Sequence, residues 1–321
     1  MNASDTLTIS VIICAYTEER WDDLCQSINA VQQQTIRPQQ ILLVIDHNPN
    51  LYTRATSHIR GVTVMENQGA QGLGGARNRG VEAATSDIVA FLDDDAVPDP
   101  VWLEYLTAPF ADEQVLGVGG QAEPQYSAGR REWFPEEFNW VVGCTYRGMP
   151  ETAARVRNLH GCNMSLRREV FESLGGFRLG YGCDETELCI RLGQQWPTAI
   201  LMHEPRAKVL HHVPAARTTW RYFRTRCYFE GNSKAVIAWL VGSQYGLATE
   251  RAYTRRVLPA GVARGFVDAL TQREVAPLMR AGAIVAGLAF TAAGFLMGKT
   301  RPAREARKRG FTDVTLLRSA G

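Results

Sequence analysis

Residues 88–95 have the sequence Ile-Val-Ala-Phe-Leu-Asp-Asp-Asp, an unbroken apolar run that ends abruptly in three carboxylates. Apolar runs of the same kind occur earlier in the chain, at 8–14, 41–45 and 62–65. Helix-like stretches separate the runs, near 21–34, 51–58 and 75–84. Continuous apolar runs that alternate with helices are typical of parallel strands covered on both faces. We therefore predict an α/β fold.

Polar residues follow each apolar run, and in parallel sheets ligands bind at these carboxyl ends of the strands. Side chains two apart on an extended segment point the same way, so Asp93 and Asp95 are placed to share one divalent cation. Oxygen ligands suit Mg²⁺ or Mn²⁺, with substrate phosphates completing the shell. His211, which ends a short apolar stretch, is a further candidate ligand. The alternative is a solvated acidic turn before Pro98.

A glycine-rich stretch at 69–80 opens the helix that follows the third run. It is not a dinucleotide fingerprint, because Arg77 stands where a third glycine would be required. We predict a loop that lets Gly74, the neighbouring backbone and Arg77 approach a diphosphate at the start of a helix. The alternative is a purely structural role in close helix packing.

A second group of carboxylates, Asp184, Glu185 and Glu187, falls in the first turn of a predicted helix. Acidic residues in this position often serve only to complement the helix dipole, and Arg191 is spaced to pair with Glu187. The functional alternative is a general base at the rim of a cleft.

Charge is divided unevenly along the 321 residues, whose net charge is +2. Residues 1–205 carry a net charge of −12 and residues 206–321 carry +14. The division indicates one region that holds cations and another that faces anions. The seven cysteines are scattered and contain no Cys-x-x-Cys pair, which argues against zinc and disulfides. The N-terminus has no basic, apolar leader, so we expect no secretory signal.

The basic part contains segments that favour a membrane surface. Residues 217–229 interleave arginines with aromatic side chains, as interfacial helices do. Residues 281–298 carry no charge, and a basic segment follows as far as 309. We expect 281–298 to be interfacial or re-entrant, with a buried helix and then a true span as alternatives. Basic-aromatic patterns also occur in nucleic-acid binders, but the acidic first part would repel nucleic acid, so we expect no such partner.

Several stretches, occurring in the family's order over about residues 8–230, resemble glycosyltransferase family two. They are Ser-Val-Ile-Ile-Cys-Ala-Tyr-Thr-Glu at 10–18, Leu-Asp-Asp-Asp-Ala at 92–96, Asn-Met-Ser-Leu-Arg-Arg at 163–168, Gly-Gly-Phe at 175–177 and the acidic helix at 184–191. The stretch from Trp133 to Trp140 is similar to actinobacterial and archaeal members of the glucosyl-dolichyl-phosphate glucuronosyltransferase type. The resemblance implies a GT-A fold, a Rossmann-like mixed sheet flanked by helices.

The resemblance also implies a metal-dependent, inverting transfer from a nucleotide-diphosphate sugar, with a UDP-sugar favoured, to a hydroxyl acceptor. Asp93 and Asp95 match the family's Asp-x-Asp pair, which binds Mn²⁺ or Mg²⁺. Glu185 falls where the family places its catalytic base, and Asp184 is the alternative. With the strand-end reasoning, the expected nucleotide-sugar site comprises Ala15, Tyr16, Thr17, Glu18, Asp46, Gly74, Arg77, Asp93 and Asp94, with Asp46 placed to accept from a uracil.

The acceptor side is expected at about 120–195, with Trp133, Trp140, Asn163 and Glu187 as its residues. Arg217 and Arg224 are candidate contacts for a diphosphate or a lipid. We predict a catalytic domain over 1–215 and a helical, basic region over 216–321 that associates with a membrane or with a second copy.

The predicted acceptor is a lipid-linked saccharide or another glycan at the cytoplasmic face of the plasma membrane. The alternatives are a soluble small-molecule acceptor and a nucleotide-sugar-binding partner of a membrane assembly without transfer activity.

Overall fold

The computed structural model describes residues 7–178, 183–242 and 248–300. The chain forms two compact units. The first unit comprises 1–125, 150–180 and 184–212, and the second comprises 126–149, 181–183 and 213–321. The second unit therefore combines the C-terminal part with a segment that lies far from it in sequence.

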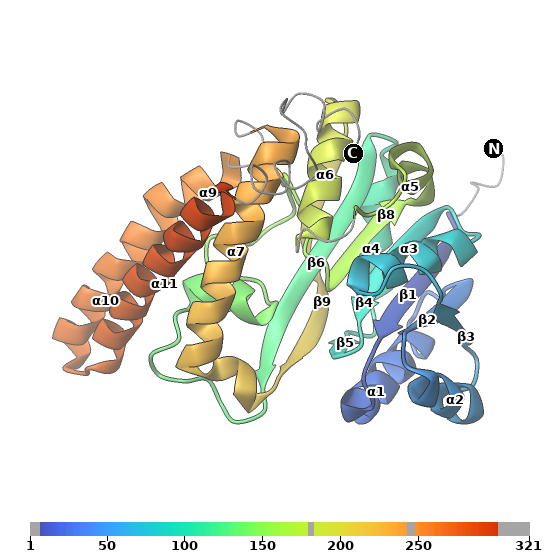
Figure 1. Ribbon diagram of the computed structural model, residues 1–321, viewed down its shortest axis with the longest axis horizontal. Coiled ribbons are helices and arrows are strands. Elements are labelled where there is room, and N and C mark those ends of the chain that lie inside the picture. The colour runs from blue at the N-terminus through green and yellow to red at the C-terminus, as the bar shows by residue number, and fades with distance from the viewer. Residues whose placement is uncertain (1–6, 179–182, 243–247, 301–321) are drawn as a thin grey trace. The chain divides into compact units, whose positions relative to one another are not determined.

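Four parallel strands begin the sheet of the first unit (Figure 1). They are β1 (Ile9–Ala15), β2 (Gln40–Asp46), β3 (Thr63–Asn67) and β4 (Ile88–Asp93), side by side in the order β3-β2-β1-β4. Within this sheet Ile13 of β1 pairs with Leu43 on one side and with Leu92 on the other. This register brings the carboxyl ends of β1, β2 and β4 to one edge, as the apolar runs predict.

The remaining strands make the sheet mixed, which agrees with the GT-A expectation. They are β5 (Ala96–Pro98), β6 (Val115–Tyr126), β7 (Ala154–Arg155), β8 (Asn163–Arg167) and β9 (Ile200–Val213). β8 is antiparallel to β4 and to β6, and β5 is antiparallel to β9. The pattern of parallel strands therefore holds for the first half of the sheet and ends at β4.

One of these strands, β9, is long and contains a proline, Pro205. β7 pairs with 202–203 and β5 with 209–211, so the proline falls between the two paired stretches. A proline, which has no amide hydrogen, is tolerated in a strand at such a position.

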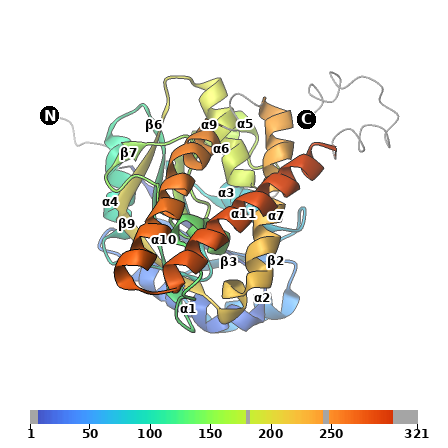
Figure 2. The ribbon, with the colours of Figure 1, turned by 90° about the vertical axis from the view of Figure 1, so that its left-hand side faces the viewer.

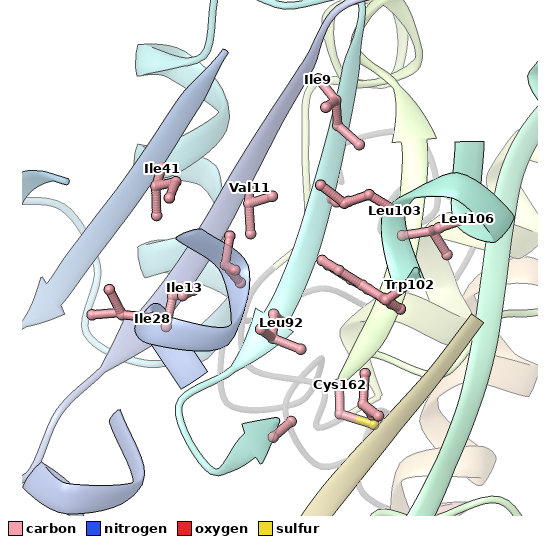
Figure 3. Packing of buried hydrophobic residues seen from close by; sticks show 14 of the residues in the cluster. Ile9, Val11, Ile13, Ile28, Ile41, Leu92, Trp102, Leu103, Leu106 and Cys162 are labelled. Atoms are coloured by element: carbon pink, nitrogen blue, oxygen red, sulfur yellow. The ribbon is translucent and has the colours of Figure 1, made fainter. Parts of the chain in front are cut away.

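Helices cover both faces of the sheet. They are α1 (Trp21–Gln32), α2 (Pro49–His58), α3 (Leu73–Ala83), α4 (Trp102–Thr107), α5 (Arg168–Leu174) and α6 (Asp184–Gln195), with short 3-10 turns at Glu18–Arg20 and Ala108–Ala111. Alternate residues of β1 enter different apolar clusters: Ile13 faces one and Ile12 the other. Figure 3 shows the first cluster, where Trp102 of α4 lies among side chains of the sheet.

The second unit is helical around its own aromatic core. Its elements are η3 (Glu136–Val142), η4 (Ala215–Thr218), α7 (Trp220–Val241), α9 (Ala248–Ala252), a π-helical turn at Tyr253–Val257, α10 (Leu258–Gln272) and α11 (Ala276–Gly298). Phe138, Phe223 and Ile284 are buried together in this core. α11 packs against both α7 and α10 (Figure 2). By length and composition α11 is apolar enough to cross a membrane, with a mean hydropathy of 1.8 over its most apolar window.

Candidate functional site

Two aspartates and a histidine converge where β4 ends and β5 begins. Asp93 closes β4, and Asp95 directly precedes Ala96, which pairs with His211 of β9. One ligand atom from each of Asp93, Asp95 and His211 lies within 4.8 Å of the other two. The Nε2 atom of His211 is 3.2 Å from Oδ1 of Asp95. The pairing of β5 with β9 thus brings a histidine more than a hundred residues away to the acidic turn.

This donor set fits a divalent cation. Carboxylate oxygens suit Mg²⁺ and Mn²⁺, whereas an imidazole suits transition metals, so a mixed set favours Mn²⁺ over Mg²⁺. Asp95 and His211 are buried, and Asp93 is half-buried. A cation held by these three residues would therefore be reached from the side of Asp93.

Arg20 is a cation at this site that the sequence analysis did not single out. Its Nη1 atom is 2.9 Å from Oδ1 of Asp94 and 3.1 Å from Oδ2 of Asp95. It lies in the 3-10 turn after β1, which is the strand next to β4. The signal available in the sequence was electrostatic: three adjacent carboxylates need compensating charge, and Arg20 follows a neighbouring strand end.

Asp94 points into the protein. Its side chain is 5% exposed, and Oδ2 has no hydrogen-bond partner within the described part of the chain. The pKa of Asp94 is raised to about 7, chiefly by burial; the charges of Asp95 and Asp93 also raise it, and the Arg20 charge lowers it. The structure thus places Asp94, expected to contact the donor, against Arg20.

Arg77 holds Asp93 from the other side. Its guanidinium donates to Oδ1 of Asp93 at 3.3 Å and to the carbonyl of Gly161 at 2.7 Å. The side chain is buried, and its guanidinium carbon lies 5.8 Å from the ring centre of Phe91 and 5.7 Å from that of Phe177. Arg77, expected near the base or the diphosphate, is in this structure a buried partner of Asp93.

Asp46 fixes the glycine-rich loop to the end of β2. Its Oδ1 accepts from Asn67 at 2.7 Å and from His47 at 2.9 Å, and its Oδ2 accepts from the Gly72 amide at 2.8 Å. Burial would raise the pKa of Asp46, but these three hydrogen bonds lower it below its ordinary value. Both oxygens, one of which was expected to meet a uracil, thus already have partners.

The loop has a tight backbone that only glycine permits. Gly72 has a φ of +118°, in the region that disfavours other residues. A Cβ atom on Gly75 would lie 1.9 Å from the carbonyl oxygen of Ala70. Gly74, expected to contact the donor, is buried in the first turn of α3.

The end of β1 offers accessible groups near Arg20. Ala15 is buried, whereas the Tyr16 side chain is 56% exposed and Glu18 is exposed as well. Thr17 caps the following turn by accepting from the Glu19 amide at 3.3 Å. These expected donor contacts therefore divide into an accessible pair, Tyr16 and Glu18, and a structural pair.

The acids of α6 also divide into two kinds. Asp184 and Glu185 are half-buried in its first turn. Glu187 is fully buried, and its Oε1 atom accepts from Nε of Arg191 at 2.7 Å. Arg191 also donates to the carbonyls of Leu174 and Gly176 at 2.7 Å each, so the pair fastens α6 to the end of α5. Glu187, expected on the acceptor side, therefore has the structural partner that its spacing allows.

Asn163, also expected on the acceptor side, is a fully buried connector. Its Oδ1 accepts from the Trp102 indole at 2.8 Å. Its Nδ2 donates to the carbonyls of Gln121 and Ala207 at 3.0 and 2.9 Å. The amide thus joins α4 to two strands.

The other expected acceptor and lipid contacts belong to the second unit. Trp133 packs on Trp220 with ring centres 5.2 Å apart, and the Trp140 indole donates to the Tyr253 hydroxyl at 3.2 Å. Arg217 is half-buried, and Arg224 is exposed on α7. The basic segment from 301 to 309, expected to meet a membrane, lies outside the described residues.

Comparison with known proteins places these features in a family context. The family model described as glycosyl transferase family 2 matches residues 10–175. Over 313 residues the chain is 30% identical to the glucosyl-dolichyl phosphate glucuronosyltransferase of Haloferax volcanii, covering 92% of this chain and 97% of the relative.

Two solved structures share the fold. The mannosyltransferase PcManGT from Pyrobaculum calidifontis, in complex with GDP-Man and Mn²⁺, matches with a TM-score of 0.57 at 17% identity, over 90% of this chain and 88% of its own. GalNAc-T7 with UDP, GalNAc and Mn²⁺ matches with a TM-score of 0.52 at 17% identity, over 79% of this chain and 55% of its own.

Proposed function

Because the chain belongs to glycosyl transferase family 2 and is a glycosyltransferase, we propose that it transfers a sugar from a nucleotide-diphosphate sugar to a hydroxyl of a lipid-linked acceptor, with inversion at the sugar carbon. The observation that carries the proposal is the convergence of Asp93, Asp95 and His211 at one edge of the sheet. A site of this kind is what a diphosphate leaving group requires.

The three converging residues would hold Mn²⁺, with Mg²⁺ as the weaker alternative. When bound, such an ion supplies positive charge against the charge that develops on the departing nucleoside diphosphate. Arg20 and Arg77 keep the carboxylates in place. Arg20, in the 3-10 turn after β1, pairs with Asp95, and Arg77, in α3, pairs with Asp93. Both solved relatives were obtained with Mn²⁺, which supports the choice of metal.

UDP is the nucleotide that we propose, on the strength of the sequence resemblance. Asp46 then acts indirectly: it holds the loop of Gly72 in place and leaves base recognition to the accessible groups after β1, Tyr16 and Glu18. A donor phosphate would lie near the amino end of α3, where the helix dipole favours an anion.

Glu185 is the base that we propose, with Asp184 as the alternative. A carboxylate at the half-buried first turn of α6 is accessible to an acceptor, unlike Glu187. Glu185 takes the proton from the acceptor hydroxyl. The oxygen of that hydroxyl attacks the sugar carbon from the face opposite the diphosphate. The pair formed by Glu187 and Arg191 keeps α6 in position during this step.

The acceptor proposal rests on the archaeal relative, whose name describes transfer to glucosyl-dolichyl phosphate and which is covered over nearly its whole length. We propose that the enzyme acts on a polyprenyl-phosphate-linked sugar at the cytoplasmic face of the plasma membrane.

A transfer assay tests the proposal. The full-length chain is incubated with each of UDP-glucuronic acid, UDP-glucose and UDP-N-acetylglucosamine, with Mn²⁺ and a glucosyl-dolichyl-phosphate acceptor. We expect one donor to be consumed and an elongated lipid to form, with neither in the presence of a chelator. Transfer only to a free sugar would contradict the lipid-linked acceptor, and undiminished transfer with a chelator would contradict the metal role.

A further inference from the structure

The outer face of α10 and α11 is apolar over residues 259–270 and 278–297. Every exposed residue from 278 to 297 on α11 is apolar, and so is every exposed residue from 259 to 270 on α10. The largest of these side chains are strongly exposed: Leu270 at 81%, Val285 at 57% and Leu296 at 64%. Soluble proteins rarely leave a contiguous apolar surface of this extent uncovered.

The second unit does not need this face for its own packing. The opposite side of α11 already lies against α7, and the backbones approach so closely that a Cβ on Gly294 would lie 1.9 Å from the carbonyl oxygen of Tyr228. Gly231 of α7 is equally close to the carbonyl oxygen of Thr291. Ile284 and Leu258 fill the core beneath the two helices. The outer face is therefore available to another occupant.

The charges around the face favour an anionic lipid surface over a second copy. Residues 251–300 include seven basic residues and two acidic ones, Asp268 and Glu274. Arg255 and Arg256 are exposed just before α10, and Lys299 is exposed just after α11. A second copy would bring the same positive excess against itself, whereas anionic headgroups attract each nearby cation.

The charges of α10 argue against a membrane span. If α11 crossed the bilayer, α10, which packs along it, would lie in the bilayer as well. Arg264 and Asp268 of α10 would then be in hydrocarbon, where charged side chains are costly. Arg273 and Glu274, in the turn between the helices, are both exposed. A helix pair with an apolar outer face and charged ends instead suits the interface between headgroups and acyl chains.

We propose that the outer face of α10 and α11 docks into the interfacial layer of an anionic bilayer, with both helices parallel to the membrane plane. This docking surface rests on the proposed function, whose acceptor is lipid-linked. It also places the membrane contact on α10 and α11 and not on residues 217–229. In that segment Phe223 and Cys227 belong to the core of the second unit. Only part of the segment, including Trp220 and Phe229, is left exposed.

Vesicle co-sedimentation of the full-length chain tests the docking surface. We compare phosphatidylcholine vesicles with equimolar phosphatidylcholine and phosphatidylglycerol. The wild-type chain should bind the anionic vesicles more tightly. The double variant Leu270→Glu/Val285→Glu should lose at least about tenfold in partition coefficient, since each change puts a charge on the docking face. The matched control is Ile36→Glu, an apolar residue of the first unit that is 41% exposed, and it should bind as the wild type does.

Two results would overturn the inference. One is vesicle binding by the double variant as tight as that of the wild type, with circular dichroism showing both folded. The other is a wild-type dimer in solution that the double variant converts to a monomer without change in vesicle binding, which would assign the face to a second copy. Donor consumption is measured in parallel with a water-soluble acceptor analogue. If only vesicle binding is lost, the proposed sugar transfer still holds. If only donor consumption is lost, the proposed docking surface still holds.

Discussion

Two regions depart from ordinary globular packing. The strand ends of the first unit bury charged groups, whereas the outer face of α10 and α11 in the second unit exposes apolar groups. At the strand ends, Asp94 and Asp95 are buried although charged groups normally stay in water. On the helix pair, Leu270 and Val285 are exposed although apolar groups of this size normally form part of a core. The first departure is offset inside the protein, by Arg20, which pairs with both aspartates, and by His211, which contacts Asp95. The second has no such offset within the described residues.

The two regions find their missing partners in different places. A buried cluster already supplied with arginines needs only a small, highly charged ligand, because its geometry is held in advance. An apolar face several turns long needs an extended partner, because no small molecule covers it. We therefore expect sugar transfer to depend on residues of the first unit and membrane attachment to depend on residues of the second.

The largest effect should come from the base. Glu185→Gln removes the group that takes the acceptor proton, and the transfer rate should fall by about 10²- to 10⁴-fold. Binding of UDP with Mn²⁺, followed by isothermal titration calorimetry, should be unchanged. Asp184→Asn is the paired variant, and a greater loss in that variant would assign the proton transfer to Asp184. Wild-type transfer rates in both variants would break the assignment of chemistry to the first unit.

Arg20 tests whether the acidic site is organised before any ligand arrives. Arg20→Met leaves Asp94 and Asp95 without their shared cation, and Mn²⁺ affinity should fall about 10- to 100-fold, as it does when partners of metal ligands are lost. Electron paramagnetic resonance of free Mn²⁺ measures the Mn²⁺ affinity, at a temperature where the variant is folded.

The control for this variant is Arg79→Met, since the Arg79 side chain is 42% exposed and pairs with Glu82, at 3.3 Å, rather than with an aspartate of the acidic site. Arg20→Lys should recover part of the affinity because it restores a hydrogen-bond donor that positions the two carboxylates. Mn²⁺ binding by Arg20→Met as tight as that of the wild type would show that the arginine has no part in organising the site.

Two glycines of α11 distinguish its packed side from its outer face. Gly294→Ala places a Cβ against the backbone of α7 and should lower the free energy of unfolding by about 1–3 kcal/mol. Gly282→Ala meets no atom within 4 Å and should raise the free energy by up to about 1 kcal/mol, because alanine is the better helix former. Chemical denaturation measures both. Equal effects at the two positions would contradict the division of α11 into two faces.

The smallest effect concerns an ordinary surface carboxylate. The Oδ2 atom of Asp87 accepts from the amide and the hydroxyl of Thr8 at 2.8 and 2.7 Å, and these hydrogen bonds lower the pKa of Asp87 below its ordinary value of 3.8. A lowered folded-state pKa gives stability that is present above pH 3.8 and is lost as the pH falls through the folded-state value.

Asp87→Asn should therefore cost up to about 1 kcal/mol at neutral pH, because the group is exposed, and nearly nothing in strong acid. Urea unfolding of both chains at the two pH values measures the difference. A difference as large in acid as at neutral pH would contradict the assignment.

The parts of the fold that depend on local pattern were predictable. The four parallel strands follow from unbroken apolar runs, and the pairing of Glu187 with Arg191 follows from helical spacing. Asp93 and Asp95 stood out because they directly follow such a run. Pro205 is tolerated inside β9, since a proline ends a strand only where its missing amide hydrogen is needed by a neighbour.

The parts that depend on distant contacts were not predictable. Asn163 looked like an acceptor contact, but its partners Trp102, Gln121 and Ala207 come from three separate elements. Arg20 escaped notice because its role depends on β1 lying beside β4. The outer face of α10 was missed as well, because small residues such as Ala260 and Ala263 make it unremarkable until exposure is known.

We propose that Asp93, Asp95 and His211 form a divalent cation site that binds the donor diphosphate. Its most direct test is a titration of the full-length chain with Mn²⁺, in the presence and absence of UDP, followed by electron paramagnetic resonance. We predict one bound Mn²⁺ per chain and tighter Mn²⁺ binding when UDP is present. In Asp93→Asn/Asp95→Asn, we expect the bound Mn²⁺ and the effect of UDP both to be lost. Unchanged Mn²⁺ binding in that double variant, with or without UDP, would contradict it.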